Sequence, residues 1–189
     1  MTNIYFVRHA QPDRGWPEDR TKPLTALGLE ERKNVTSLLC KFPIDVFFSS
    51  PYKRSIDTIS ECANLFNMQI HIDERFRERQ SGENGYTVDI LEKRWKDFDF
   101  CEDGGESLNS VQSRNVEVLN ELLCIHNGKN IVVGTHGTAL STILNYFDSS
   151  FDCECFKRIW HSMPYIILIR FKNKDYKGKE ELLNIESFH

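Results

Sequence analysis

Short runs of apolar, β-favouring residues recur along the chain, and polar positions rarely interrupt them. Such uninterrupted runs are typical of strands that are covered on both faces of a sheet, since a strand with one exposed face alternates. The runs that predict strands cover residues 3–7, 45–48, 69–72, 131–135 and 165–171. A final segment, 181–186, predicts a strand that pairs antiparallel with 165–171.

Between these strands, apolar residues recur with the 3.6-residue period of amphipathic helices. The helices predicted on this basis cover residues 25–42, 50–66, 107–124 and 138–147. Thr25 is the expected N-cap of the first helix, and Leu27 is expected on its buried stripe. For the second helix, Ser50 is the expected cap and Pro51 the first helical residue. Strands that alternate with helices predict an α/β fold with a mostly parallel sheet and helices on both faces.

Length and composition fit one globular domain over residues 1–189. The chain is 40 % hydrophobic and 28 % charged, which is ordinary for a folded protein. Its net charge of −4 argues against a general nucleic-acid or membrane-surface binder, so an anionic substrate would have to be attracted by a local group of cations.

Targeting signals and a disulfide pattern are not visible in the sequence. No apolar run approaches the length of a membrane span, and no signal-peptide pattern precedes the first strand. The six cysteines are scattered and therefore read as free thiols in a reducing compartment. A cytoplasmic location is the expectation.

Cations and imidazoles follow three of the predicted strands. Arg8 and His9 come directly after the first strand, Arg54 lies in the first turn of the helix after the second, and His136 follows IVVGT. Taken singly, each could be a strand surfacing at its end. Together they favour a ligand site, because the carboxyl ends of parallel strands form one edge of an open α/β sheet.

The residue types at this edge suit a phosphate group. Arginine forks hold phosphate oxygens bidentately, and helix N-termini favour anions. The sequence has no GxxxxGK[ST], which excludes a nucleotide-binding P-loop. No carboxylate-rich cluster accompanies the histidines, so no metal and no other cofactor are expected.

Six short motifs follow one another in the order found in a known family. They are VRHA at 7–10, PLTALG at 23–28, FFSSPYKRSIDT at 47–58, ERFRE at 74–78, GGES at 104–107 and GTHG at 134–137. As a set they resemble the histidine phosphatase superfamily, also called the phosphoglycerate mutase-like family, in its small phosphatase branch. The resemblance implies a three-layer α/β/α sandwich.

The same resemblance implies roles for individual residues. His9 would be the catalytic nucleophile, Arg8, Arg54 and His136 would bind and stabilise the phosphoryl group, and Glu78 would be the acid and base. The chemistry is consistent, since a neutral histidine can carry a phosphoryl group and neighbouring arginines lower its pKa. Glu83 is the rival for the acid, and Glu78 among its arginines could instead form a surface ion pair.

Further substrate contacts are less sharply marked. Gln11, Ser55 and Arg20 are candidates for lining the site, with Trp16 in the same loop as Arg20; solvated loop positions are the alternative for each. The pocket for the leaving group is expected from residues 11–22 and 79–104.

The chain departs from the family pattern in two places. Ala10 replaces the usual glycine of RHG, which could restrict the local backbone. SGENGYT at 81–87 replaces a G-x-W-E-G-type stretch, and the connection from Glu78 to Gly105 is too short for the insertion that mutases carry. We therefore predict a metal-independent phosphomonoesterase acting on a small phosphorylated substrate. A phosphoglycerate mutase-type transferase and a non-catalytic phospho-ligand binding domain are the alternatives.

Overall fold

The computed structural model describes residues 1–83 and 87–186, and within these residues six strands form one sheet in the order β3-β2-β4-β1-β5-β6. The strands are β1 (Thr2–Arg8), β2 (Val46–Ser49), β3 (Ile70–Ile72), β4 (Asn130–Thr135), β5 (Ser162–Lys172) and β6 (Asp175–Glu186). The first four are parallel to one another, and β5 and β6 are antiparallel to their neighbours. The expected mostly parallel sheet is confirmed, as is the antiparallel last strand.

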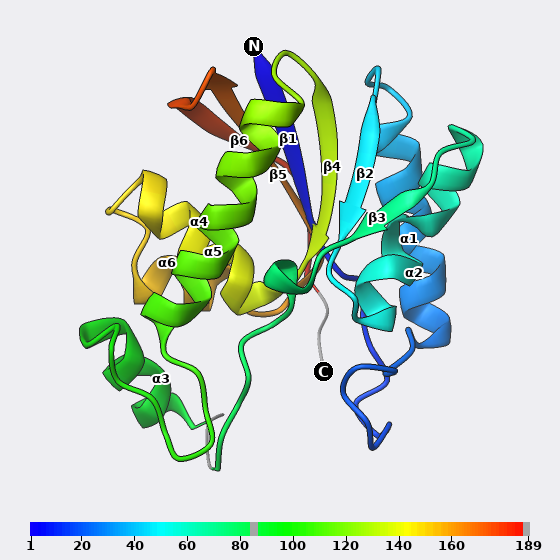
Figure 1. Cartoon of the computed structure of the whole chain (residues 1–189). Helices are drawn as coiled ribbons and strands as arrows, with labels where there is room; N and C mark the ends of the chain where they lie inside the picture. Colours follow the sequence, from blue (N-terminus) through cyan, green and yellow to red (C-terminus); the bar gives the residue numbers. More distant parts are fainter. Residues whose placement is uncertain (84–86, 187–189) are drawn as a thin grey trace.

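Helices cover both faces of the sheet (Figure 1). They are α1 (Ala26–Leu39), α2 (Lys53–Leu65), α3 (Val88–Lys96), α4 (Leu108–Ile125), α5 (Gly137–Phe147) and α6 (Cys153–Ile159), with a 3₁₀ turn, η1 (Glu74–Phe76). Figure 1 shows α1 and α2 on one side of the sheet and α4, α5 and α6 on the other. The three-layer α/β/α architecture is therefore confirmed.

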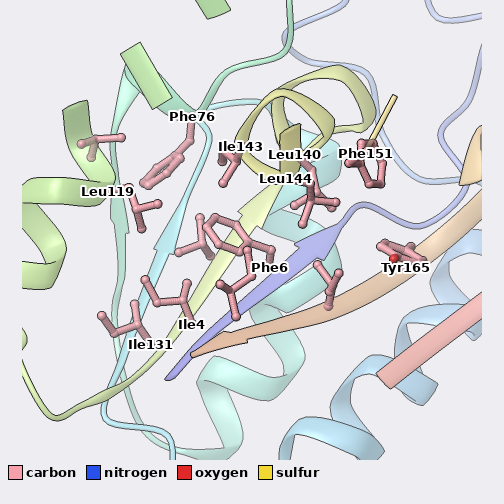
Figure 2. Packing of buried hydrophobic residues seen from close by; sticks show 14 of the residues in the cluster. Ile4, Phe6, Phe76, Leu119, Ile131, Leu140, Ile143, Leu144, Phe151 and Tyr165 are labelled. Atoms are coloured by element: carbon pink, nitrogen blue, oxygen red, sulfur yellow. The ribbon is translucent and has the colours of Figure 1, made fainter. Parts of the chain in front are cut away.

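The alternation of side chains along β1 explains how its uniformly apolar sequence is used. Ile4 and Phe6 pack in one buried cluster with residues of α4 and α5, as Figure 2 shows for this face of the sheet. Tyr5 and Val7 point the other way and pack in a second cluster with residues of α1 and α2. Both faces of β1 are thus covered, which firmly fixes the strand end that carries Arg8.

Two local predictions about the first two helices differ from the structure. Thr25 caps α1 as expected, but Leu27 is 52 % exposed; the small Gly28 faces inward instead, against the backbone of Gln11. The prediction that Ser50 caps the second helix is wrong. That helix begins at Lys53, and the Ser50 hydroxyl bonds with His136.

Helices α3 and α6 were not predicted. They have nine and seven residues, and both are rich in charged side chains. Each turns few apolar residues toward the core, so neither shows an extended helical period. Both matter for the site, because they close one side of its cavity.

Candidate active site

The two histidines meet at the carboxyl ends of the central strands. His9 directly follows β1, His136 directly follows β4, and the backbone N–H of His9 donates to the Thr135 carbonyl at 3.2 Å. The two imidazole rings lie 5.3 Å apart, centroid to centroid. Adjacent parallel strands therefore bring together two residues that are 127 positions apart in the sequence.

The hydrogen bonds of His9 define which ring nitrogen carries its proton. Nδ1 lies 2.8 Å from the Ala10 carbonyl oxygen, which can only accept, so Nδ1 is the donor. Nε2 is left with its lone pair and accepts from Nε of Arg54 at 3.2 Å. Burial, then Arg54 and Arg8, hold the pKa of His9 well below its usual value. The side chain is therefore neutral at pH 7, as a nucleophile must be.

Ala10 does not strain this turn. Among the described residues, the non-glycine residues with a positive φ are Asn67 and Asn173, so Ala10 has an ordinary backbone conformation. Its N–H donates to the Thr58 hydroxyl at 2.9 Å, and its methyl group is fully buried. The departure from RHG is accommodated by packing.

His136 is the more deeply buried of the two histidines, with no exposed surface. Its Nε2 lies 2.7 Å from the Ser50 hydroxyl, and its ring packs edge-on against Tyr52 at 5.1 Å. Burial, then Arg54 and His9, keep the pKa of His136 well below its usual value. A neutral His136 is available to donate a hydrogen bond rather than to add a full charge.

Arg8 is anchored from the far end of the chain. Its Nη1 donates to the carbonyl oxygens of Ile159 at 2.6 Å and Ser162 at 3.2 Å. Its guanidinium lies flat on Gly137, where a Cβ would come within 3.1 Å of it. A larger residue at the start of α5 would push the Arg8 guanidinium out of this position by a few tenths of an ångström. Burial lowers the pKa of Arg8 to about 10, so it remains charged at pH 7.

The carboxylate of Glu78 is held at the N-terminus of α5. It accepts from the backbone N–H groups of Thr138 and Ala139, both at 3.1 Å, and from that of Arg79 at 2.8 Å. A helix N-terminus is a favourable place for a carboxylate. It also fixes Glu78 beside Arg8, because both side chains contact the first turn of α5.

The alternative reading of Glu78 as a surface ion pair does not match the structure. Among the described residues no ion pair involves Glu78; Arg77 binds Glu106 at 2.8 Å and Arg79 binds Glu102 at 2.7 Å. The rival acid, Glu83, is exposed and does not line the cavity.

A cavity of about 520 Å³ opens beside His9. Its cationic lining residues are Arg8, Arg14, Lys22, Arg54, Arg79 and Arg94, and its acidic ones are Asp19 and Glu78. Its apolar lining residues are Pro12, Leu91, Leu108, Phe156, Trp160 and Met163. Cations outnumber acids around the cavity although the whole chain is negatively charged, so the local attraction for anions that we expected is present.

The carboxylate of Glu102 holds one wall of this cavity together. Glu102 is buried and accepts from Arg79 at 2.7 Å, Arg94 at 3.0 Å and the Gly82 N–H at 3.1 Å. Burial alone would raise the pKa of Glu102, but hydrogen bonds from its own backbone N–H, from Arg79 and from the Gly82 N–H outweigh burial and lower the pKa to about 2. The segment after Glu78 is thereby tied to α3.

None of the four residues considered for substrate contact, Gln11, Trp16, Arg20 and Ser55, lines the cavity. Ser55 is fully buried and pairs with the Ser49 hydroxyl at 3.1 Å, against Gly134 of β4. The Gln11 amide oxygen accepts from the Thr25 hydroxyl at 2.7 Å. Arg20 is half exposed and forms an ion pair with Glu74. Residues 11–22 and 79–104 do contribute other lining residues, among them Arg14, Asp19, Lys22, Ser81 and Arg94. None of these five belongs to a motif that would have identified it.

Metal ligands and membrane spans were also sought. Within residues 1–83 and 87–186, no three His, Cys, Asp or Glu side chains lie close enough together to hold a metal ion. In the same residues, no helix has the length and apolarity needed to cross a membrane.

A family model for the histidine phosphatase superfamily (branch 1) matches residues 4–184. The chain belongs to this superfamily. Its phosphoserine phosphatase 1 relative from Hydrogenobacter thermophilus is 32 % identical over 152 residues, covering 72 % of this chain and 71 % of the relative. A 2,3-bisphosphoglycerate-dependent phosphoglycerate mutase 2 from Gloeobacter violaceus is 26 % identical over 170 residues, covering 78 % and 76 %.

Coverage of the relatives is not always this broad. The match to the putative phosphoserine phosphatase 2 of H. thermophilus, 32 % identical over 87 residues, spans 43 % of that protein and 44 % of this chain. Among solved structures, phosphoserine phosphatase from Entamoeba histolytica in complex with 3-phosphoglyceric acid has a TM-score of 0.77 at 21 % identity, with 100 % of this chain and 98 % of that one covered. At this identity the structural similarity establishes the fold of this superfamily member.

Proposed function

We propose that this histidine phosphatase superfamily member is a metal-independent phosphomonoesterase that hydrolyses a small phosphate ester through a phosphohistidine on His9. The observation that carries the proposal is the lone pair of His9 Nε2, which a neutral, buried imidazole presents beside the guanidinium of Arg54. A phosphoryl group bound by Arg54 and Arg8 would lie within reach of that nitrogen. The two guanidinium groups supply positive charge to the phosphoryl oxygens.

The reaction has two steps. His9 Nε2 attacks phosphorus and forms an N–P bond while the ester P–O bond breaks, and Glu78 gives its proton to the leaving oxygen. Water then attacks the phosphohistidine, Glu78 takes the proton from that water, and the N–P bond breaks to release inorganic phosphate. The two steps use Glu78 in opposite senses, first as the acid and then as the base. Its position at the head of α5, beside Arg8, keeps it next to the phosphoryl site in both steps.

Phosphatase activity is favoured over mutase activity by the connection between Glu78 and α4. The described part of that connection, residues 79–83 and 87–107, consists of α3 and segments that the ion pairs of Glu102 hold together, with no further helix or strand to cover the site. Small phosphorylated acids, such as the phosphoserine and 3-phosphoglycerate found in the names of related proteins and structures, are the first substrates to test.

The decisive test measures phosphate release from an aryl phosphate and from these esters in the presence of EDTA. We expect turnover by the wild type and none by His9→Ala. His71→Ala is the matched control, because His71 is an exposed imidazole on β3, away from the cavity. An acid-labile phosphoryl group should map to His9 after a rapid alkaline quench.

Two outcomes would reject parts of this proposal. Full turnover by His9→Ala excludes His9 as the nucleophile. Phosphate release that depends on added 2,3-bisphosphoglycerate identifies a mutase instead.

A further inference from the structure

The guanidinium of Arg54 is already occupied by a carboxylate of the chain itself. Its Nη1 donates to the Asp19 backbone carbonyl at 2.7 Å and to Asp19 Oδ1 at 3.2 Å, and its Nη2 donates to Oδ2 at 3.4 Å. With Nε bonded to His9, all three nitrogens of Arg54 have partners. A phosphoryl group that accepts from both Nη1 and Nη2 of this fork therefore competes with the Asp19 carboxylate.

Asp19 and Arg54 differ in how firmly they are held. The Arg54 side chain is 6 % exposed, whereas the Asp19 side chain is 53 % exposed and lies at the rim of the cavity. The segment that carries Asp19 is fixed at its base by a bridge between Pro12 and Leu24, and by the Lys53 N–H bond to the Arg20 carbonyl at 2.9 Å. The carboxylate can therefore swing into solvent while the loop and Arg54 stay in place.

A second cation is held in the same way. Lys22 Nζ, which also lines the cavity, lies 3.0 Å from Asp19 Oδ1. Displacing one carboxylate would thus release two cations, one buried and one at the rim, for the incoming anion. Leaving Asp19 in place would instead set its negative charge against the phosphoryl oxygens, which is unfavourable at short range.

We propose that Asp19 is an internal competitor for the phosphoryl-binding fork of Arg54 and thereby sets the affinity of the site for phosphate. The inference rests on the proposed function, because it assumes that Arg54 binds the substrate phosphoryl group. Asp19 weakens the binding of the substrate phosphoryl group and of the phosphate product equally, because both bind the same fork. Its return to Arg54 after hydrolysis favours the departure of inorganic phosphate.

The change that tests this is Asp19→Asn, which keeps the size of the side chain and the backbone carbonyl contact but removes the charge. When a site is available only part of the time, the apparent dissociation constant is the intrinsic one divided by the available fraction, so we expect a dissociation constant for inorganic phosphate about three- to tenfold lower than in the wild type. The inhibition constant of phosphate against aryl phosphate hydrolysis should fall by the same factor.

Glu18→Gln is the matched control. Glu18 precedes Asp19 and carries the same charge, but its carboxylate accepts from the backbone N–H groups of Arg20 and Thr21, and it does not line the cavity. Phosphate affinity is measured by titration calorimetry at pH 7.5 for the wild type and both variants. Tighter binding by Asp19→Asn with unchanged binding by Glu18→Gln supports the competitor role.

Three results would overturn it, and they have different meanings. Unchanged or weaker binding by Asp19→Asn, in a protein whose wild type binds and hydrolyses phosphate esters, rejects the competitor role alone. Equal tightening in both variants shows a general effect of net charge and also rejects it. A wild type that neither binds phosphate nor hydrolyses esters rejects the proposed function together with this inference.

Discussion

The two ends of the cavity are built in different ways. At the phosphate end, His9 and His136 are extensions of adjacent central strands and Arg54 lies in the first turn of α2, so the backbone of the sheet positions them. At the leaving-group end, the wall comes from α3, α6 and the segment after Glu78, which are joined to the core by a few side chains. The phosphate end is suited to carrying out the same phosphoryl chemistry on different substrates. The leaving-group end can change its shape without moving the nucleophile.

The largest effect on the reaction rate should come from replacing Glu78, which lies between the phosphate end and the leaving-group end of the cavity. Replacing it with glutamine removes the proton that the leaving oxygen needs, so kcat for an alkyl phosphate should fall about 10²–10⁴-fold. The aryloxide of an aryl phosphate can leave without a proton, so Glu78→Gln should release a burst of phenol and then stall at the phosphohistidine. Stopped-flow assays of both substrates measure this.

Glu83→Gln is the control for that experiment, since Glu83 is exposed and does not line the cavity. It should leave the rate for both substrates unchanged. The same loss of rate in Glu83→Gln, with full activity in Glu78→Gln, would reassign the acid.

A smaller and different effect should come from the leaving-group wall. Leu91 of α3 is 4 % exposed and lines the cavity, so Leu91→Ala removes apolar contact from the leaving group and should lower the free energy of unfolding by about 2–5 kcal/mol. We expect KM for a bulky ester to rise while the inhibition constant of inorganic phosphate stays the same. An equal change in both constants would show that the two ends are not independent.

The smallest effect should appear in the pH dependence of stability. Burial first, and then the charges of Arg8 and Arg54, lower the pKa of His9 in the folded state, so the unfolded chain binds more protons just below pH 6.5. The stability contributed by neutral His9 is therefore complete above pH 6.5 and is lost as the pH falls below it. His9→Gln should reduce the slope of the unfolding free energy between pH 6.5 and 5 by up to about 1.4 kcal/mol per pH unit.

Urea unfolding of the wild type and His9→Gln at several pH values measures this slope. Glu102, whose pKa is about 2, titrates below this window and does not contribute to the difference. Identical slopes would mean that His9 binds protons equally in the folded and unfolded chain, so that folding does not lower its pKa.

The sequence was sufficient for the phosphate end because its residues occupy strand ends. Apolar runs placed Arg8, His9 and His136 at the same edge, and the order of strands in the sheet then made β1 and β4 neighbours. The sequence did not reveal which side chains from distant parts of the chain bond to one another. Ser50 has the composition of a helix cap, and only the folded structure brings its hydroxyl to His136, 86 residues away.

For the leaving-group end, the sequence predicted only which two stretches of the chain would form the pocket, and not which of their residues would line it. The lining does include residues from 11–22 and 79–104, as expected, but α6 and the start of β5 contribute Phe156, Trp160 and Met163 as well. A short, charged helix such as α6 has too few apolar positions to show a period. Residues 84–86, within the SGENGYT stretch, lie outside the described residues.

The anchoring of Arg8 has a consequence for the order in which the protein is made. The two carbonyls that hold its guanidinium are 151 and 154 residues further along the chain, at the end of α6 and the start of β5. During synthesis the chain emerges from its N-terminus onward, and a domain generally folds as a unit. A nascent chain that has emerged only as far as α5 therefore contains both histidines, but it does not yet contain the two carbonyl groups that hold the Arg8 guanidinium in place.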